Sequence, residues 1–127
     1  MSDVISLCVP AKTKYISAAR LAVSSACGEL DFDINKIDDL KSCIGESCLI
    51  IMCSMAHREV LINCEISRDI KVEICGKGKL ERNADCRCDE LDEEISKIMI
   101  NSLADECEMQ EEGGKTNKII FTIKAGD

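Results

Sequence analysis

The chain has 127 residues and a mass of 14.0 kDa, which is the size of one domain with one hydrophobic core and excludes a two-domain enzyme. Its 16 basic and 24 acidic side chains leave a net charge of −8, and aromatic residues make up only 2% of the chain. This composition opposes both attraction to a phosphate backbone and stacking on bases, so we expect no nucleic acid partner. No apolar run approaches the ~18 residues of a membrane helix, and the first residues lack the features of a secretory leader. We therefore expect a single domain over residues 1–127, without a membrane partner and in the cytoplasm.

Ten cysteines are spread along a chain that is 46% hydrophobic, whereas small disulfide scaffolds are poor in aliphatic core residues. Eight of the cysteines lie in apolar stretches, where a reduced thiol packs as a small hydrophobic side chain: Cys8, Cys27, Cys43, Cys48, Cys53, Cys64, Cys75 and Cys107. The other two, Cys86 and Cys88, lie in a polar stretch and are candidates for an oxidisable pair. Together with the distant His57 they supply too few paired ligands for zinc, so we expect no structural metal.

The first half of the chain predicts a strand followed by two helices. The apolar run Val4–Val9 is typical of a strand that ends at Pro10. Residues 15–27 are rich in alanine and leucine and predict the first helix. The second helix is predicted by apolar residues that recur every three or four positions, namely Ile37, Leu40, Ile44, Cys48 and Ile51.

A change of period after His57 predicts a hairpin. Apolar and polar residues alternate over 60–66 and again over 70–74, with a short turn between them. Residues 76–90 carry many charges and few large apolar side chains, so we expect them to form a mobile connection.

The last third predicts one more helix and one more hairpin. Leu91–Leu103 has helical spacing, and its first turn lies in the acidic stretch 89–94, which is favourable near a helix N-terminus. A strand at 106–110, a turn at 111–117 and a strand at 118–124 complete the chain. Three helices and about five strands predict an α+β two-layer sandwich, with a mainly antiparallel sheet covered on one face by the helices.

Three stretches carry a resemblance to a known family: Cys8–Lys12 (CVPAK), Ile37–Cys48 (IDDLKSCIGESC) and Asp105–Cys107 (DEC) before the last hairpin. In this order of elements they resemble the anti-sigma factor serine kinases of Gram-positive bacteria, which belong to the histidine-kinase-like ATPase superfamily. The resemblance covers nearly the whole chain. It implies the histidine-kinase-like ATPase (Bergerat) sandwich, a sigma factor or an anti-sigma-factor antagonist as partner, and a homodimer.

The same resemblance implies site positions on the second helix. In the family an acidic residue acts on the attacking hydroxyl, and an asparagine four positions later helps to hold magnesium on the phosphates. Glu46 stands at the acidic position, and Ile50 stands at the asparagine position. A hydrocarbon side chain cannot supply the oxygen ligand that magnesium requires, so the metal loses its protein anchor.

Two further family elements are also altered. The adenine-binding motif Asp-x-Gly-x-Gly corresponds to Ile74–Gly78, which keeps Gly76 and Gly78 but has Ile74 in place of the aspartate. A shift of the alignment by two residues puts Gly76 there instead, again without a carboxylate. The glycine-rich lid that wraps the phosphates corresponds to Glu94–Ser96, inside the acidic stretch, where negative charge repels phosphate. Glycines at the end of a strand also suit an ordinary turn.

These substitutions favour a regulatory domain that binds ATP poorly, needs no cofactor and acts through protein contacts in transcriptional regulation, with Glu46 as a vestigial base. One alternative is an active serine kinase that uses ATP, magnesium and Glu46 as its base. A second alternative is a cysteine-based redox or metal sensor that uses Cys86 and Cys88. The small residues of the first helix and the strand Val4–Val9 are candidates for a homodimer contact. The acidic stretch 89–94 is either a solvated helix start or a docking face for a basic partner.

Overall fold

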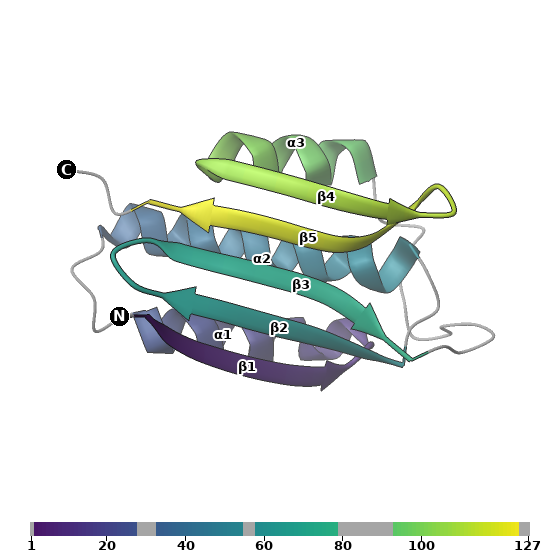
Figure 1. Cartoon of the computed structure of the whole chain (residues 1–127), viewed down its shortest axis with the longest axis horizontal. Coiled ribbons are helices and arrows are strands. Elements are labelled where there is room, and N and C mark those ends of the chain that lie inside the picture. Colours follow the sequence, from purple (N-terminus) through teal and green to yellow (C-terminus); the bar gives the residue numbers. More distant parts are fainter. Residues whose placement is uncertain (1, 28–32, 55–57, 79–92, 125–127) are drawn as a thin grey trace.

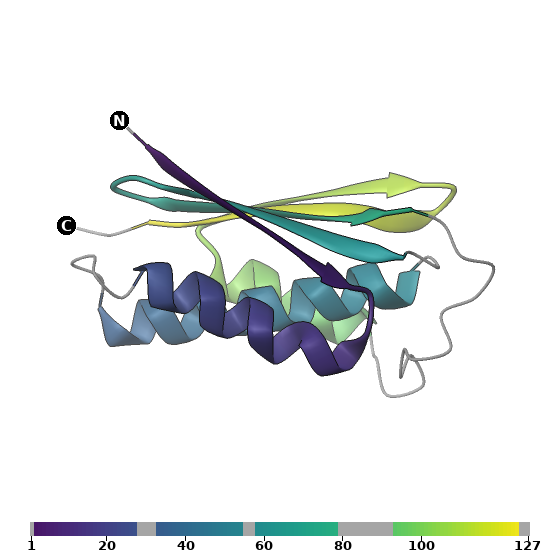
Figure 2. The ribbon, with the colours of Figure 1, turned by 90° about the horizontal axis from the view of Figure 1, so that it is seen from below.

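The computed structural model describes residues 2–27, 33–54, 58–78 and 93–124, which form two layers (Figures 1 and 2). One layer is a five-stranded sheet, and the other consists of α-helices that all lie on the same face of that sheet. The elements in chain order are β1 (Asp3–Pro10), a short 3-10 turn (Thr13–Tyr15), α1 (Ile16–Cys27), α2 (Ile34–Ser54), β2 (Glu59–Ile66), β3 (Ile70–Lys77), α3 (Glu93–Leu103), β4 (Glu106–Glu112) and β5 (Lys115–Ile123). The predicted α+β two-layer sandwich is confirmed.

The strands are ordered β1-β2-β3-β5-β4, and every pairing between neighbours is antiparallel. The predicted hairpin of β2 and β3 is present, but β3 continues to Lys77, three residues beyond the predicted end. β1 and β4 form the two edges of the sheet.

The core lies between the sheet and the helices. Side chains along a strand alternate between its two faces, so every second residue of a strand points into this core. In β2 the buried residues are Val60, Ile62, Cys64 and Ile66, and the central strands add Val72, Ile119 and Phe121. The opposite face of the sheet carries mainly polar side chains that reach solvent, including Ser6, Glu65 and Lys71. Within the described residues, no helix combines the length and the apolar character needed to cross a membrane.

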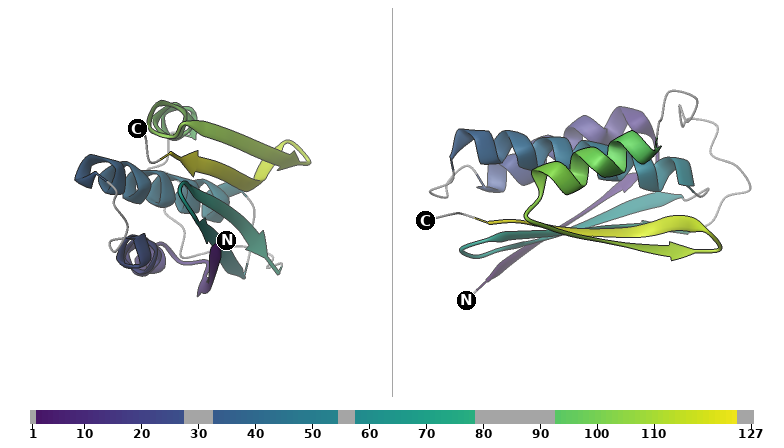
Figure 3. Two further views of the ribbon diagram at one scale, coloured as in Figure 1. Left: turned by 60° about the vertical axis from the view of Figure 1, so that its left-hand side comes forward. Right: turned by 90° about the horizontal axis from the view of Figure 1, so that it is seen from above.

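The helices form a row in which α2 lies between α1 and α3 and packs on β3 and β5 (Figure 3). Leu40, Ile44, Cys48 and Ile51 of α2 are completely buried, so the predicted core stripe of this helix is confirmed. The central position explains why α2 also buries residues outside this stripe, including Cys43 and Ile50.

The C-terminal hairpin is tighter than predicted. Only Gly113 and Gly114 form the turn, and both have positive φ angles, +60° and +78°, as a two-residue hairpin of this kind requires. The predicted turn over 111–117 is wrong in extent, because Thr116 already belongs to β5 and is only 1% exposed.

The apolar stripe that predicts α3 faces outward. Ile95, Ile98 and Met99 are 56%, 64% and 38% exposed, whereas Ser96 and Ile100 are buried. Helical spacing identifies a face but not the direction in which it points, and here the packing of α3 against α2 selects the side with the serine.

The cysteines differ in exposure and in oxidation state more than predicted. Cys27, Cys43, Cys48 and Cys64 are buried free thiols, as expected, and Cys75 and Cys107 are half-buried. Two assignments are wrong. Cys8 is exposed, because alternation along β1 places it on the open face of the sheet, and Cys53 is disulfide-bonded. The predictions for His57, Cys86, Cys88, Leu91 and most of the connection 76–90 lie outside the described residues.

Candidate functional site

Glu46 lies in the middle of α2, on the side that meets α3. Its carboxylate is engaged there, because the hydroxyl of Ser96 donates a hydrogen bond of 2.6 Å to Glu46 Oε2. Glu46 is half-buried and Ser96 is 5% exposed. A hydrogen bond to a carboxylate is stronger than one between neutral groups, so this contact joins the two helices at the position of the candidate base.

Ile50 and Ile74 occupy the positions where the resemblance places a magnesium ligand and an adenine ligand. Both side chains are 0% exposed, and both belong to the hydrophobic core. They come from different layers, Ile50 from α2 and Ile74 from β3. Neither side chain offers a polar atom to a ligand, and neither reaches solvent.

The two glycines have structural roles. Gly76 lies inside β3, opposite Val60 of β2, and is not at the end of the strand as predicted. Gly78 follows β3 with a φ of +71°, and an added Cβ would lie 3.0 Å from the Cβ of Arg58. Glycine is therefore required at position 78 by the turn and by the close approach of Arg58, without any ligand.

Two of the three residues that match the lid are exposed. Glu94 and Ile95 face solvent at the start of α3, while Ser96 faces inward to Glu46. Residues 89–92, which form the first part of the acidic stretch 89–94, lie outside the described residues.

The thiols near Glu46 are poor nucleophiles. Burial raises the pKa of Cys43, one turn before Glu46, to about 12, and the charges of Asp39 and Glu46 act in the same direction. Burial also raises the pKa of Cys48 to about 12. Both side chains therefore remain neutral thiols at physiological pH. They are poor nucleophiles because the thiolate is the reactive form.

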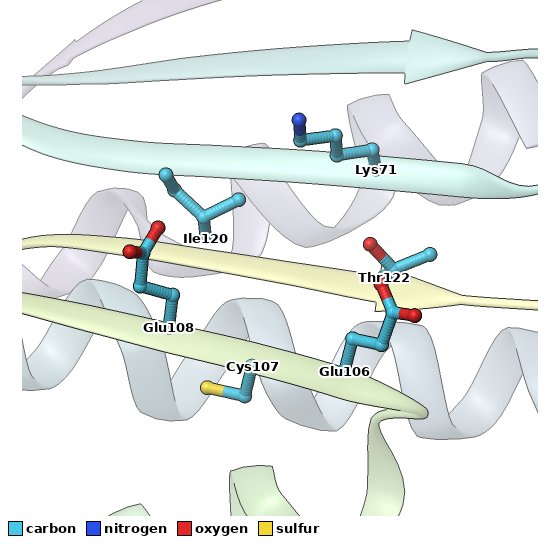
Figure 4. Close-up of a pocket in the computed structure, with 6 residues that line it drawn as sticks. All are labelled: Lys71, Glu106, Cys107, Glu108, Ile120 and Thr122. Carbon is cyan, nitrogen blue, oxygen red and sulfur yellow. The ribbon is translucent and has the colours of Figure 1, made fainter.

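A shallow hollow on the open face of the sheet does not suit a nucleotide (Figure 4). It has a volume of about 230 Å³ and is lined by Lys71, Glu106, Cys107, Glu108, Ile120 and Thr122. Ligand pockets for small molecules are commonly about 300 to 1,000 Å³. The two carboxylates of the hollow outnumber its single lysine, so its net negative charge repels a triphosphate. The hollow also lies on the side of the sheet opposite the helices (Figure 4).

A second hollow of about 220 Å³ lies beside α1 and α2 and is lined by Ser17, Arg20, Leu21 and Lys41. Its two cations stand out in an acidic protein, but neither hollow includes Glu46, Ile50 or Ile74. Among the described residues, no cluster of three or more His, Cys, Asp or Glu side chains has the arrangement of a metal site.

Sequence reasoning identified Glu46 but missed its partner. Ser96 lies 50 residues away along the chain, and nothing in the spacing of α2 or α3 links the two side chains. Of the predicted site, the structure therefore retains one polar contact, between the Glu46 carboxylate and the Ser96 hydroxyl, while Ile50 and Ile74 belong to the hydrophobic core.

No protein-family model matches the chain, and no curated protein matches it significantly. The class that the described residues define is therefore an architectural one, a two-layer α+β sandwich with an antiparallel sheet.

Proposed function

We propose that this chain is a cytoplasmic regulatory domain of the anti-sigma factor serine kinase type, built on the histidine-kinase-like ATPase scaffold and acting through protein contacts rather than nucleotide chemistry. The element order, the antiparallel sheet and the helices on one face agree with the fold that the sequence resemblance implies. Its proposed partner is a sigma factor or an anti-sigma-factor antagonist.

The observation that carries the proposal is the complete burial of Ile50 and Ile74. A nucleotide site at these positions would need oxygen ligands for magnesium and for the adenine amino group. Two fully buried isoleucines provide neither, and a polar ligand group placed against them without a partner would lose about 1 to 3 kcal/mol.

The contact between Glu46 and Ser96 supports the same proposal. An active base must be free to accept a proton from a substrate hydroxyl. Here the Glu46 carboxylate accepts a hydrogen bond from within the chain, where α3 packs on α2. A substrate would have to displace Ser96 first.

Calorimetric titration of the purified chain with ATP and magnesium tests the proposal. We expect no heat of binding in the micromolar concentration range and no rise in the unfolding temperature at millimolar nucleotide, because a ligand that binds the folded state stabilises it by mass action. A micromolar dissociation constant would overturn the proposal.

A restored variant gives a complementary test. Ile50→Asn together with Ile74→Asp returns the two missing polar groups and should raise the affinity for ATP and magnesium. Both changes put polar groups into the core, so circular dichroism and the single variant Ile50→Asn serve as controls for folding. A folded double variant with unchanged affinity would mean that these two positions do not account for the loss of binding.

The proposed homodimer would use β1 and α1. β1 is an edge strand whose Val4 and Ile5 are 64% and 38% exposed, and Ala18 and Ala22 of α1 are exposed as well. An exposed edge strand can pair with another chain, and a lysine on the edge prevents this. Sedimentation velocity should find a dimer for the wild-type chain and a monomer for Val4→Lys.

An active serine kinase with Glu46 as base is the second candidate function. Glu46 Oε2 accepts a hydrogen bond from the Ser96 hydroxyl at 2.6 Å, so a substrate hydroxyl that displaced Ser96 would lie within the reach of a general base. Transfer of labelled phosphate from ATP to a protein substrate, abolished in Glu46→Gln, would favour this candidate over the regulatory domain.

A cysteine-based redox sensor is favoured by the disulfide bond at Cys53. Mass spectrometry of the chain, alkylated under denaturing conditions with and without prior reduction, tests this candidate. Ten alkylated thiols without reduction would contradict it.

A further inference from the structure

α3 carries an apolar face that the described fold does not cover. Ile95, Ile98 and Met99 are spaced by three and four residues and so lie on one side of the helix, and all three are exposed. α3 lies at the border of the helical layer, with α2 on one side only (Figure 3). Three large exposed apolar side chains on one helix face are a feature of interaction surfaces rather than of scattered surface residues.

The surroundings of this face are acidic. The first turn of α3 carries the carboxylates of Glu93 and Glu94, and the single cation of this helix is Lys97. Lys97 is already shared between Glu93 at 3.7 Å and Glu111 at 3.9 Å. Glu94, at the N-terminal end of the apolar face, is exposed and forms no ion pair with a described residue.

We propose that the face formed by Ile95, Ile98 and Met99 docks a basic amphipathic helix of another protein. A narrow apolar stripe at helical spacing is matched by the apolar stripe of a second helix. Lysine or arginine side chains beside that stripe would reach the carboxylates at the N-terminal end of α3, Glu94 above all, and steer the encounter.

Charge complementarity argues against the other occupants of this face. A second copy of the chain docked with its α3 parallel to this one would bring Glu93 and Glu94 against the same carboxylates of its partner. An anionic membrane surface is repelled for the same reason. The docking proposal rests on the surface of α3 alone and holds whether or not the chain binds a nucleotide.

A designed peptide tests the proposal on the full chain. The probe is a fluorescein-labelled helical peptide of about five turns, with leucines on one face and lysines beside them, and its binding is measured by fluorescence anisotropy. We expect saturable binding that weakens as salt is added. A peptide with the same leucines and with glutamates in place of the lysines should not bind.

Variants locate the binding face. Ile98→Asp should weaken binding by roughly tenfold or more, and Glu94→Lys, which leaves the apolar face intact, should weaken binding and reduce its dependence on salt. The matched control is Leu21→Asp, since Leu21 is a 63% exposed apolar residue on α1, and it should bind like the wild-type chain. All these changes are at exposed positions, and thermal unfolding verifies that each variant is folded.

Four results would overturn the proposal: no binding of the basic peptide, equal binding of the acidic peptide, equal effects of Ile98→Asp and Leu21→Asp, or a dimer in sedimentation that dissociates with Ile98→Asp. The last result would assign the face to a second copy of the chain.

Discussion

At the scale of single residues, two buried serines on neighbouring helices have opposite energetic roles. Ser96 of α3 donates its hydroxyl proton to the Glu46 carboxylate, whereas Ser47 of α2 is 0% exposed and has no hydrogen-bond partner in the part of the chain that the structure describes. A buried hydroxyl stabilises a fold only when it is paired, because it loses its hydrogen bonds to water on folding. The two residues therefore predict opposite responses to the same substitution.

Ser96→Ala should destabilise the chain by about 1 to 2 kcal/mol, because it removes the hydrogen bond and leaves the half-buried Glu46 carboxylate without this donor. Urea denaturation measures the change. Ser102→Ala is the matched control, since Ser102 is an exposed residue of the same helix that donates only to the Ile98 carbonyl oxygen. Equal losses in the two variants would show that the contact with Glu46 contributes nothing.

Ser47→Ala should stabilise the chain by roughly 1 kcal/mol, because it removes an unpaired buried hydroxyl and places the best helix former in the interior of α2. The midpoint of urea denaturation should rise without a change in its slope. A lower midpoint would mean that the hydroxyl has a partner, such as a buried water molecule.

At the scale of elements, α2 stabilises the fold mainly by burying apolar side chains on more than one of its sides. It contacts both other helices and the sheet, so residues on more than one of its sides are excluded from solvent. This explains why Ile50, which lies outside the stripe predicted from the sequence, is completely buried.

Ile50→Ala should cost about 2 to 5 kcal/mol, because the lost hydrocarbon leaves a cavity in the core. Ile34→Ala in the same helix should change the free energy of unfolding by less than about 0.5 kcal/mol, since Ile34 is 74% exposed. Chemical denaturation of both variants checks this. A small effect of Ile50→Ala would indicate a position open to solvent and would weaken the argument that the nucleotide site is filled.

The β4–β5 hairpin depends on the backbone of its two glycines. Gly113 has a φ of +60°, and an added Cβ would meet nothing within 4 Å, so the effect of a substitution arises from backbone strain alone. Gly113→Asn should be nearly neutral, because asparagine adopts positive φ readily, whereas Gly113→Val should cost about 1 to 2 kcal/mol. Thermal unfolding distinguishes the two variants, and equal melting temperatures would contradict the turn geometry.

At the scale of the whole molecule, buried thiols link stability to pH. Burial raises the pKa of Cys43 and of Cys48 from 9.0 to about 12, whereas an exposed thiol in the unfolded chain keeps its ordinary value. Between these two values the unfolded state loses protons that the folded state retains. Stability from these thiols is therefore present below pH 9 and decreases as the pH rises toward 12.

The free energy of unfolding should accordingly fall as the pH is raised above 9. Urea denaturation at a series of alkaline pH values measures this fall. The double variant Cys43→Ala, Cys48→Ala is the control, and it should begin from a lower stability and lose less of it over the same range. An identical pH dependence in both proteins would mean that the two thiols do not contribute to it.

Much of the architecture could be predicted from local spacing. Alternation in residues 60–66 and 70–74 predicts β2 and β3, and the apolar stripe of α2 predicts both the helix and its buried side. These predictions succeed because the periodicity of a strand or a helix fixes which side chains share a face, and in these elements the more apolar face is the buried one. Apolar surroundings along the chain are misleading for Cys8, which alternation along β1 places on the open face of the sheet. They also do not orient α3, where Ile95, Ile98 and Met99 face solvent.

The sequence by itself determined the order and type of the elements and the hydrocarbon character of positions 50 and 74, since these depend on residue identity and on neighbours within a few positions. Only the tertiary structure decided that Glu46 is bound by Ser96, that both isoleucines are sealed in the core, and that the apolar side of α3 is left outside. Each of these outcomes depends on how segments distant in the sequence pack together, and the packing of α3 on α2 has no counterpart in the local pattern of either helix.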